Sequence, residues 1–358
     1  MEYALSAPPG DGVSSLSFSP VVGSLDLLVG SWDTTVRLYD AARNSCKLTC
    51  TLGGACLGSC FGVDGALAFA GGLDQGVYSL DLHRGGAKTV LGGHSKAVSC
   101  MQYNSLCQLL FTGGWDCMVN AWDERSSKGT GSFETLGGKV FSLTTQGSLV
   151  VAATSNKQIL VYDTRNLAEP LQVRDSPLRN QIRKVALSPL ATAQNDFFVL
   201  ASTEARVAVE HVNQAGAKNY AFKCHRKGNV AYPINAIAFH PVHGTFATGG
   251  CDGVVFVWDA AQKKKVSQVA SYNNSIASLA FSADGSRLAI AASYTHEEGE
   301  SPSQLGGGAR EENVFIRTLD DAEVQAKKYE RVRRRLMFSS SFTKSLSKRR
   351  RIIFSDYP

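Results

Sequence analysis

The chain has 358 residues, of which 44% are hydrophobic and 19% are charged. This composition is typical of a globular protein with a sizeable core, and it excludes a fibrous chain or one that is disordered throughout. The net charge of +6 is uneven, because residues 321–358 hold 11 Lys and Arg against 4 Asp and Glu. The preceding residues carry a net charge of −1, which gives no support to nucleic-acid binding by the main body.

Membrane and metal functions are also disfavoured. No apolar run reaches the roughly 18 to 20 residues of a membrane span, and the N-terminus lacks the basic and apolar regions of a signal peptide. Nine cysteines without a C-x-x-C pair are typical of free thiols in a reducing compartment. We interpret Cys46, Cys50, Cys56 and Cys60 as small strand residues, not zinc ligands. The sequence thus predicts a soluble intracellular protein with no cofactor, metal or membrane partner.

Short apolar runs alternate with polar turns along the chain, with little room for helices. The first strand of each unit is expected at 13–20, 55–62, 97–104, 140–147, 182–189, 234–241 and 275–282. The second is expected at 25–31, 66–72, 108–114, 148–154, 196–202, 244–250 and 287–293. Residues 314–320 supply a third strand to the last unit, and residues 2–7 are expected to supply its fourth. The units therefore predict a closed ring of seven four-stranded blades without an unpaired edge.

A polar turn residue recurs three positions before an aliphatic one in six of these units. The turn residues are Asp33, Asp74, Asp116, Asn156, Glu204 and Asp252, with spacings of 41, 42, 40, 48 and 48 residues. A period near 40 to 45 residues is typical of four-stranded propeller blades.

Only the third unit adds the full signature, because "GGH" with His94 precedes Thr112, Asp116 and Trp122. In this the chain resembles the WD-repeat family, in which such residues form a hydrogen-bonded tetrad. We expect a structural role, since an unpaired buried donor costs about 1 to 3 kcal/mol. The fold class is thus all-β, a seven-bladed WD-repeat β-propeller closed by an N-terminal strand over residues 1–320, followed by a basic, helix-prone to disordered extension over 321–358.

Residues 202–241, with "RVAVEHV", "YAFKCHR" and "YPINAIAFH", resemble the spindle-checkpoint propellers of the Bub3 family. They are more distantly similar to the Rae/Gle type of messenger-RNA export propeller. The resemblance covers residues 1 to about 320. It implies a non-enzymatic scaffold of the mitotic spindle checkpoint, in the nucleus, at kinetochores during mitosis and also in the cytoplasm.

The same resemblance implies the partners. One is a checkpoint kinase or pseudokinase that carries a GLEBS segment, and another is a kinetochore scaffold with phosphorylated Met-Glu-Leu-Thr repeats. The checkpoint also connects such propellers to the anaphase-promoting complex of the ubiquitin pathway. Messenger-RNA export is the alternative function.

Trp32 and Trp115 come directly before turn aspartates, a position that we expect on the upper rim of the ring. Exposed indoles would be rigid anchors for a peptide, whereas the alternative is ordinary inward packing. Arg206 is a charged residue two positions after a turn residue, where the other units have uncharged ones. The resemblance implies that Trp32, Trp115 and Arg206 bind the GLEBS segment. The alternative for Arg206 is an ion pair with Glu204 or Glu210.

A basic run, "KCHRK", brings Lys223, His225, Arg226 and Lys227 within five residues. Such a cluster can hold a dianionic phosphate through charge-assisted hydrogen bonds. The resemblance implies that Lys223 and Arg226 receive the phosphothreonine of the kinetochore repeats. The alternative is a solvated charged run.

Three further features of the sequence bear on function. "WDER" at 122–125 matches the W-D-x-R box of cullin-RING ligase substrate receptors, a further alternative. The basic clusters at 333–335 and 348–351 are compatible with a nuclear import signal or a contact with nucleic acid, although a disordered tail is the default interpretation. No nucleophile elbow, phosphate-binding glycine loop or dinucleotide fingerprint occurs in a suitable context, so no enzymatic activity is expected.

Overall fold

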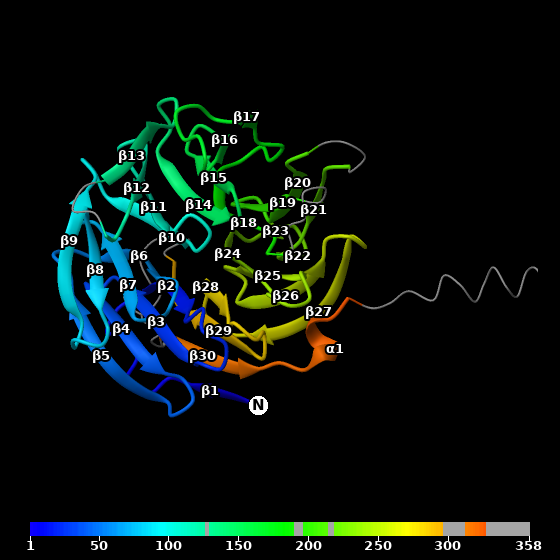
Figure 1. Ribbon diagram of the computed structural model, residues 1–358. Coiled ribbons are helices and arrows are strands. Elements are labelled where there is room, and N and C mark those ends of the chain that lie inside the picture. Colours follow the sequence, from blue (N-terminus) through cyan, green and yellow to red (C-terminus); the bar gives the residue numbers. More distant parts are fainter. Residues whose placement is uncertain (126–128, 190–195, 214–217, 296–311, 327–358) are drawn as a thin grey trace, which may run out of the picture. The chain divides into compact units, whose positions relative to one another are not determined.

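The computed structural model describes residues 1–125, 129–189, 196–213, 218–295 and 312–326. Seven four-stranded antiparallel sheets are arranged as blades around a central axis (Figure 1). The predicted seven-bladed β-propeller is therefore confirmed. Residues up to Gln325 form one compact unit.

The strands of blades one to six run outward from the central axis in chain order. Blade one consists of β2 (Val13–Phe18), β3 (Asp26–Ser31), β4 (Thr35–Asp40) and β5 (Ser45–Thr51). Blade two consists of β6 (Cys56–Phe61), β7 (Leu67–Gly72), β8 (Gly76–Asp81) and β9 (Ala87–Gly93). Blade three consists of β10 (Val98–Asn104), β11 (Leu109–Gly114), β12 (Met118–Trp122) and β13 (Gly129–Glu134).

The next three blades repeat the pattern. Blade four consists of β14 (Val140–Gln146), β15 (Leu149–Thr154), β16 (Gln158–Asp163) and β17 (Gln172–Asp175). Blade five consists of β18 (Ile182–Leu187), β19 (Phe197–Ser202), β20 (Arg206–His211) and β21 (Tyr220–Lys223). A small hairpin of β22 (Arg226–Lys227) and β23 (Val230–Ala231) precedes blade six, which consists of β24 (Ile234–Phe239), β25 (Phe246–Gly250), β26 (Val254–Asp259) and β27 (Lys264–Ser271).

The seventh blade joins the two ends of the ring. It contains β28 (Ile276–Phe281), β29 (Arg287–Ala292), β30 (Asn313–Thr318) and, outermost, β1 (Glu2–Ala4). Tyr3 pairs with Ile316, and the Leu5 N–H donates to the Val314 carbonyl at 2.8 Å. The N-terminal strand thus closes the ring as predicted, and Figure 1 shows it (dark blue) beside β30 (orange).

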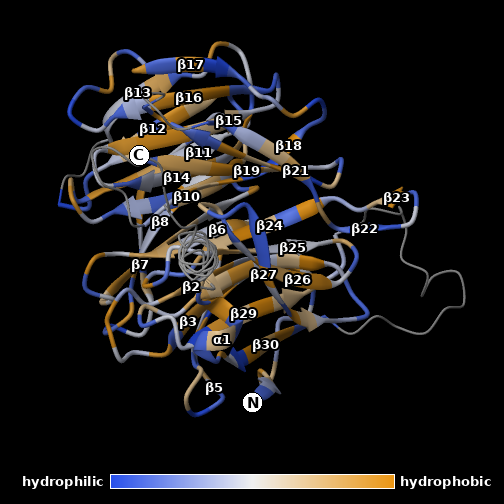
Figure 2. Ribbon diagram, turned by 90° about the vertical axis from the view of Figure 1, so that its right-hand side faces the viewer, coloured by the Kyte–Doolittle hydropathy of each residue, from blue (hydrophilic) through white to orange (hydrophobic). Residues whose placement is uncertain are grey.

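Both faces of the second strand of each blade are covered by neighbouring blades, which explains why these strands are almost continuously buried, whereas outermost strands such as β5 and β9 are largely exposed. All six residues of β15 are buried, for example. One buried cluster combines Val29 and Tyr39 of blade one with Ala289, Ala291 and Ile316 of blade seven. Figure 2 shows the same contrast, with hydrophobic strands and largely hydrophilic connections. The core is therefore a ring of packing between blades, and its closure depends on every blade.

The six turn residues share one local conformation. The residue after each has a left-handed backbone: Thr34 (φ 69°), Gln75 (70°), Cys117 (69°), Lys157 (66°), Ala205 (58°) and Gly253 (74°). The residue before each donates its backbone N–H to a carbonyl in the connection that leads into the inner strand of its blade: Trp32 to Gly12, Leu73 to Ala55, Trp115 to Ala97, Ser155 to Lys139, Thr203 to Gln181 and Cys251 to Pro233. These hydrogen bonds hold the six residues at equivalent positions on one face of the ring, called the upper face below.

A short helix, α1 (Asp321–Val324), extends the propeller beyond the boundary expected at residue 320. Ser267 Oγ donates to the Glu323 carbonyl at 2.6 Å and Thr245 Oγ1 to the Val324 carbonyl at 2.7 Å. The two predicted basic clusters at 333–335 and 348–351 lie outside the described residues. In the part of the chain that the structure describes, no helix combines the length and the apolar character needed to cross a bilayer.

Candidate functional site

The tetrad predicted for blade three is present as a buried network. His94 Nδ1 lies 3.0 Å from the Asp116 carboxylate, and its Nε2 lies 2.8 Å from Thr112 Oγ1. Trp122 Nε1 donates to the same hydroxyl oxygen at 2.8 Å. Because an indole can only donate, the Thr112 hydrogen is left for His94 Nε2, so Nδ1 carries the imidazole proton toward Asp116. Burial raises the pKa of Asp116, but hydrogen bonds, chiefly from the Ser95 N–H and His94, lower it overall.

Blade six contains a second tetrad, which the sequence analysis missed. His225 Nδ1 lies 2.8 Å from Asp252 Oδ1, His225 Nε2 lies 2.8 Å from Thr248 Oγ1, and Trp258 Nε1 donates to that hydroxyl at 2.9 Å. His225 is only 2% exposed. Its placement among exposed basic residues is therefore wrong, as is the statement that only the third unit carries the full signature.

The missed tetrad had a visible signal in the sequence. "TGGWDCMVNAW" at 112–122 and "TGGCDGVVFVW" at 248–258 have the same spacing of Thr, Asp and Trp. The spacing between the histidine and the threonine differs from that in blade three, because the β22–β23 hairpin lengthens the connection between His225 and β24. The second glycine of each pair is needed, since a Cβ on Gly114 would lie 2.4 Å from His94 Nδ1 and one on Gly250 would lie 2.5 Å from His225 Nδ1.

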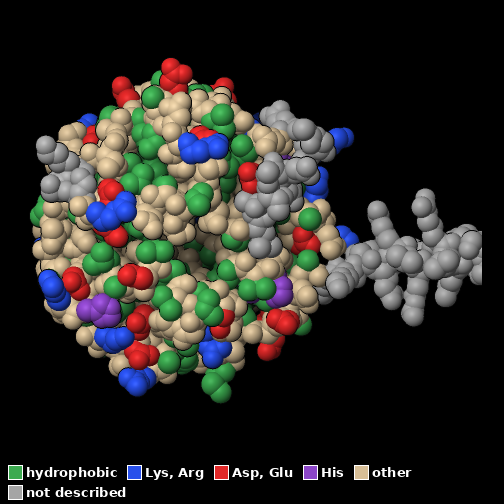
Figure 3. All heavy atoms as spheres, in the orientation of Figure 1, with side chains coloured by type: hydrophobic (Ala, Val, Ile, Leu, Met, Phe, Trp, Pro, Cys, Tyr) green, Lys and Arg blue, Asp and Glu red, His purple; other side chains and the backbone are tan. Residues whose placement is uncertain are grey.

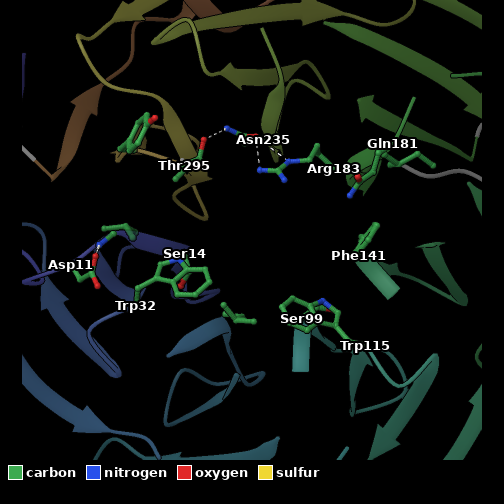
Figure 4. A pocket seen from close by; sticks show the side chains of 16 residues that line it. Asp11, Ser14, Trp32, Ser99, Trp115, Phe141, Gln181, Arg183, Asn235 and Thr295 are labelled. Atoms are coloured by element: carbon green, nitrogen blue, oxygen red, sulfur yellow. Dashed lines mark hydrogen bonds between the residues drawn. The ribbon is translucent and has the colours of Figure 1, made fainter. Parts of the chain in front are cut away.

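A cavity of about 480 Å³ opens on the upper face at the central axis, and both Trp32 and Trp115 line it (Figure 4). Trp32 is 47% exposed, and Trp115 is half-buried. Phe141 and Tyr294 are the other two aromatic residues of the lining. The two tryptophans of blades one and three thus face one cavity, whose lining also includes polar side chains and the Asp11 carboxylate. We call it the upper cavity.

The cation of the upper cavity is Arg183, on the inner strand β18. Its Nε and Nη2 donate to Asn235 Oδ1 at 3.2 and 3.0 Å, and Asn235 Nδ2 contacts Thr295 Oγ1 at 3.2 Å (Figure 4). Among the described residues no carboxylate forms an ion pair with Arg183. Asn235 therefore orients the guanidinium without neutralising it, and Nη1 is left for a ligand.

The sequence held a signal for Arg183 as well. The seven inner runs contain only two residues with a permanent charge, Arg183 and Lys184. Inner strands surround the central axis, so a charged residue there must face the channel or be buried. Turn positions by themselves do not contain this signal, because Arg183 lies on an inner strand.

Arg206 does not line the upper cavity. It begins β20, the third strand from the axis, and its Nε lies 3.7 Å from Glu204 Oε2. The ion pair with Glu204, which was the alternative interpretation, is present. In the register of β20 and β21, Arg206 lies directly opposite Lys223, and residues paired in this way project from the same face of a sheet. The structure thus separates Arg206 from the tryptophans and brings it to Lys223.

The basic run splits into exposed and buried parts. Lys223, Arg226 and Lys227 are exposed, whereas Cys224 and His225 are buried. Lys227 Nζ donates to the Asp252 carbonyl at 3.3 Å. Arg226 belongs to the β22–β23 hairpin, which projects from the right edge of the view in Figure 2. Lys223 and Arg226, the two residues expected to receive a phosphate, therefore lie on different sheets.

Arg125, in the box that matches ligase substrate receptors, has local partners. Its Nη2 lies 2.9 Å from Asp123 Oδ2, and its Nη1 contacts Gln108 Oε1 at 3.3 Å. The side chain is nonetheless 65% exposed. The geometry leaves this alternative without further support.

Comparison with known proteins agrees with this architecture. The chain matches the family model described as WD domain, G-beta repeat at residues 3–40 and 216–259, and the β-propeller model described as Nucleolar protein 10-like, N-terminal domain at residues 27–232. Fold and repeats together define a WD-repeat propeller of seven blades.

Individual relatives indicate to which family of WD-repeat propellers the chain belongs. Mitotic checkpoint protein BUB3.1 of Arabidopsis thaliana is 42% identical over 90% of this chain and 94% of its own length. Mitotic checkpoint protein bub-3 of Caenorhabditis elegans is 39% identical over 91% of this chain and 96% of its own length. Protein Rae1 of Drosophila melanogaster is 30% identical, over 89% of this chain and 94% of its length. The chain belongs to the Bub3 family of WD-repeat propellers.

Proposed function

We propose that this protein is a non-enzymatic scaffold of the mitotic spindle checkpoint. On its upper face it binds the GLEBS segment of a checkpoint kinase, and on blade five it binds phosphorylated Met-Glu-Leu-Thr repeats of a kinetochore scaffold. The observation that carries the proposal is the upper cavity, where two indoles meet a guanidinium that has no carboxylate partner among the described residues. The names of the relatives, which are mitotic checkpoint proteins, support the same role.

The upper cavity suits a peptide with apolar and acidic side chains. Trp32, Trp115 and Phe141 provide flat apolar surface with little conformational entropy to lose on binding. Arg183 offers a preoriented donor for a glutamate, and a charge-assisted bond in a partly dry cavity is stronger than a neutral one. A segment such as GLEBS, with paired glutamates, matches this combination.

The first test is affinity purification from mitotic cells. We expect the Trp32→Ala and Trp115→Ala proteins to lose the checkpoint kinases that wild-type protein recovers, because each change removes one wall of the upper cavity. Leu73→Ala is the matched control, since Leu73 has the equivalent rim position in blade two, is 39% exposed and does not line the cavity. Kinase recovery that is the same in all four proteins would contradict the proposal. Recovery of nuclear-pore proteins from interphase cells, without checkpoint kinases in mitosis, would favour the export function that the similarity to Rae1 suggests.

For the phosphothreonine we propose Lys223 together with Arg206. The two residues are opposite each other in the β20–β21 ladder. Two cations directly opposite each other on neighbouring strands repel each other, and a dianionic phosphate bound between them relieves the repulsion. Arg226, the second residue that the sequence suggested, lies on the separate hairpin.

This assignment predicts a clear order of effects on phosphopeptide affinity. We expect Arg206→Ala and Lys223→Ala each to weaken binding of a phosphothreonine peptide by at least about tenfold, because each removes a charged hydrogen bond of about 1.5 to 3 kcal/mol. Arg226→Ala, the control, should change affinity by less than about twofold. Fluorescence polarisation with phosphorylated and unphosphorylated peptides measures the difference. A loss with Arg226→Ala but not with Arg206→Ala would instead favour Lys223 and Arg226.

A further inference from the structure

The inner strands of the seven blades enclose a second cavity below the upper one, a central channel of about 470 Å³. Figure 3, which views the ring from the face opposite the upper one, shows a hollow at the centre of that face. Ser, Thr, Cys, Gln and aliphatic side chains make up most of the lining. Arg183 and Lys184 are the only charged residues among those that line the channel. Within the described parts of the chain, the channel therefore contains positive charge without a balancing carboxylate.

Lys184 is the deeper of the two cations. It follows Arg183 on β18, where a register irregularity between Ile182 and Lys184 places consecutive residues toward the channel. No side chain or carbonyl of the described residues is within hydrogen-bond distance of its ammonium group. Burial lowers the pKa of Lys184, and the titratable group that acts on it is the Cys100 thiol, itself held neutral because burial raises its pKa. An ammonium group has three N–H donors, and none of the three has an acceptor in the described part of the chain.

Other polar groups of the lining also have donors to spare. Thr144 Oγ1 accepts a hydrogen bond from the Leu187 N–H at 3.2 Å, and Ser278 Oγ accepts one from the Leu16 N–H at 3.2 Å. Neither hydroxyl has an acceptor for its own hydrogen among the described residues. Gln102 Oε1 accepts from the Thr145 N–H at 3.0 Å, which leaves the amide NH₂ without a described partner. These three side chains can therefore donate to a ligand in the channel.

We propose that the central channel is a binding site for a small oxyanion, held by Lys184. The ammonium group of half-buried Lys184 is partly removed from water and has no acceptor among the described residues, and an oxyanion supplies both a negative charge and several acceptors. Inorganic phosphate and sulfate have the right chemistry. A carboxylate of a peptide bound in the upper cavity has it too, because Arg183 lines both cavities and connects them.

Titration of the full-length protein with inorganic phosphate, followed by calorimetry at constant ionic strength, tests the site. Lys184→Met keeps the length of the side chain and removes the charge, and Lys184→Arg keeps the charge. We expect wild-type protein and Lys184→Arg to bind phosphate, and Lys184→Met to bind it at least about tenfold more weakly. Lys96→Met is the matched control, because Lys96 is exposed and lies outside the channel.

Stability provides a second measurement that does not depend on the calorimetric signal. In phosphate-free buffer, Lys184→Met should unfold at the same or a higher urea concentration than wild type, because it removes an uncompensated charge. Added phosphate should raise the unfolding midpoint of the wild-type protein and of Lys96→Met, but not that of Lys184→Met.

A peptide arm distinguishes the two sources of the anion. If acidic peptide competes with phosphate, and its affinity falls with Lys184→Met, the natural occupant is a peptide carboxylate. If phosphate binds and the peptide does not compete, the occupant is a free oxyanion. The inference is overturned if Lys184→Met changes neither phosphate nor peptide binding. The test of this site can be separated from the test of the proposed function. If the protein binds phosphate through Lys184 but does not bind GLEBS peptide, the oxyanion site is supported and GLEBS binding in the upper cavity is contradicted.

Discussion

The Arg183→Glu protein is expected to lose measurable binding to a synthetic GLEBS peptide, whereas Arg206→Glu should bind it within about twofold of wild type. Arg183 lines the same cavity as both tryptophans, but Arg206 lies on the third strand of blade five beside Glu204. Removing one partner of an interfacial charge pair costs about 2 to 5 kcal/mol, and a reversed charge adds repulsion of the glutamate. A loss of more than about 30-fold in affinity follows. Isothermal titration calorimetry measures both variants.

Two controls make this prediction sharper. Arg183 is exposed, so its substitution should leave the urea midpoint close to that of wild type. Arg183→Lys keeps the charge but loses the planar fork, and we expect an intermediate affinity. Normal peptide binding by Arg183→Glu would show that Arg183 does not contact the GLEBS peptide. Loss of binding with Arg206→Glu alone would restore the assignment first suggested by the sequence.

The His225→Ala protein is expected to be less stable than wild type by about 3 to 5 kcal/mol, a cost typical of leaving a buried charged group without its partner. The substitution removes both hydrogen bonds of the imidazole and leaves the Asp252 carboxylate, whose side chain is 3% exposed, without its main partner. Urea unfolding followed by tryptophan fluorescence measures the shift in midpoint. His94→Ala should behave similarly in blade three, where His94 is also buried.

His83→Ala is the control for this experiment, because His83 is exposed and should change stability by less than about 0.5 kcal/mol. If His225→Ala were as stable as His83→Ala but bound phosphopeptide poorly, His225 would belong to the phosphate site and not to a tetrad. The comparison therefore separates the structural role from the binding role that the basic run suggested.

The sequence predicted the architecture well because its signals are local. Each blade repeats an apolar run, a turn residue such as Asp33 or Asp116, and a second apolar run, and the spacing of these features was enough to count seven blades. The closing strand followed from the need to pair the edge of β30. His225 was missed for an equally local reason, since an inserted hairpin changed the length of the connection before its tetrad.

The candidate site was only partly predictable. The rim position of Trp32 and Trp115 follows from the turn that comes directly after each of them, and the structure places both in one cavity. Their charged neighbour did not follow in the same way. The sequence suggested Arg206 because it is charged at a turn position where the other blades have uncharged residues. Arg183 is also unusual, because it is a charged residue on an inner strand.

The sequence by itself therefore determined the seven blades, the order of their strands and the face on which the tryptophans lie. These depend on periodicity, turn conformation and hydrogen bonds within a blade, all of which act between residues close in the chain. The tertiary structure decided that Arg183 meets the tryptophans across the axis, that Arg206 pairs with Lys223 and that Lys184 lies in the channel. The physical reason is that the distance of a strand from the axis, and the residues it faces across the ring, are set only when all blades pack and β1 closes the circle.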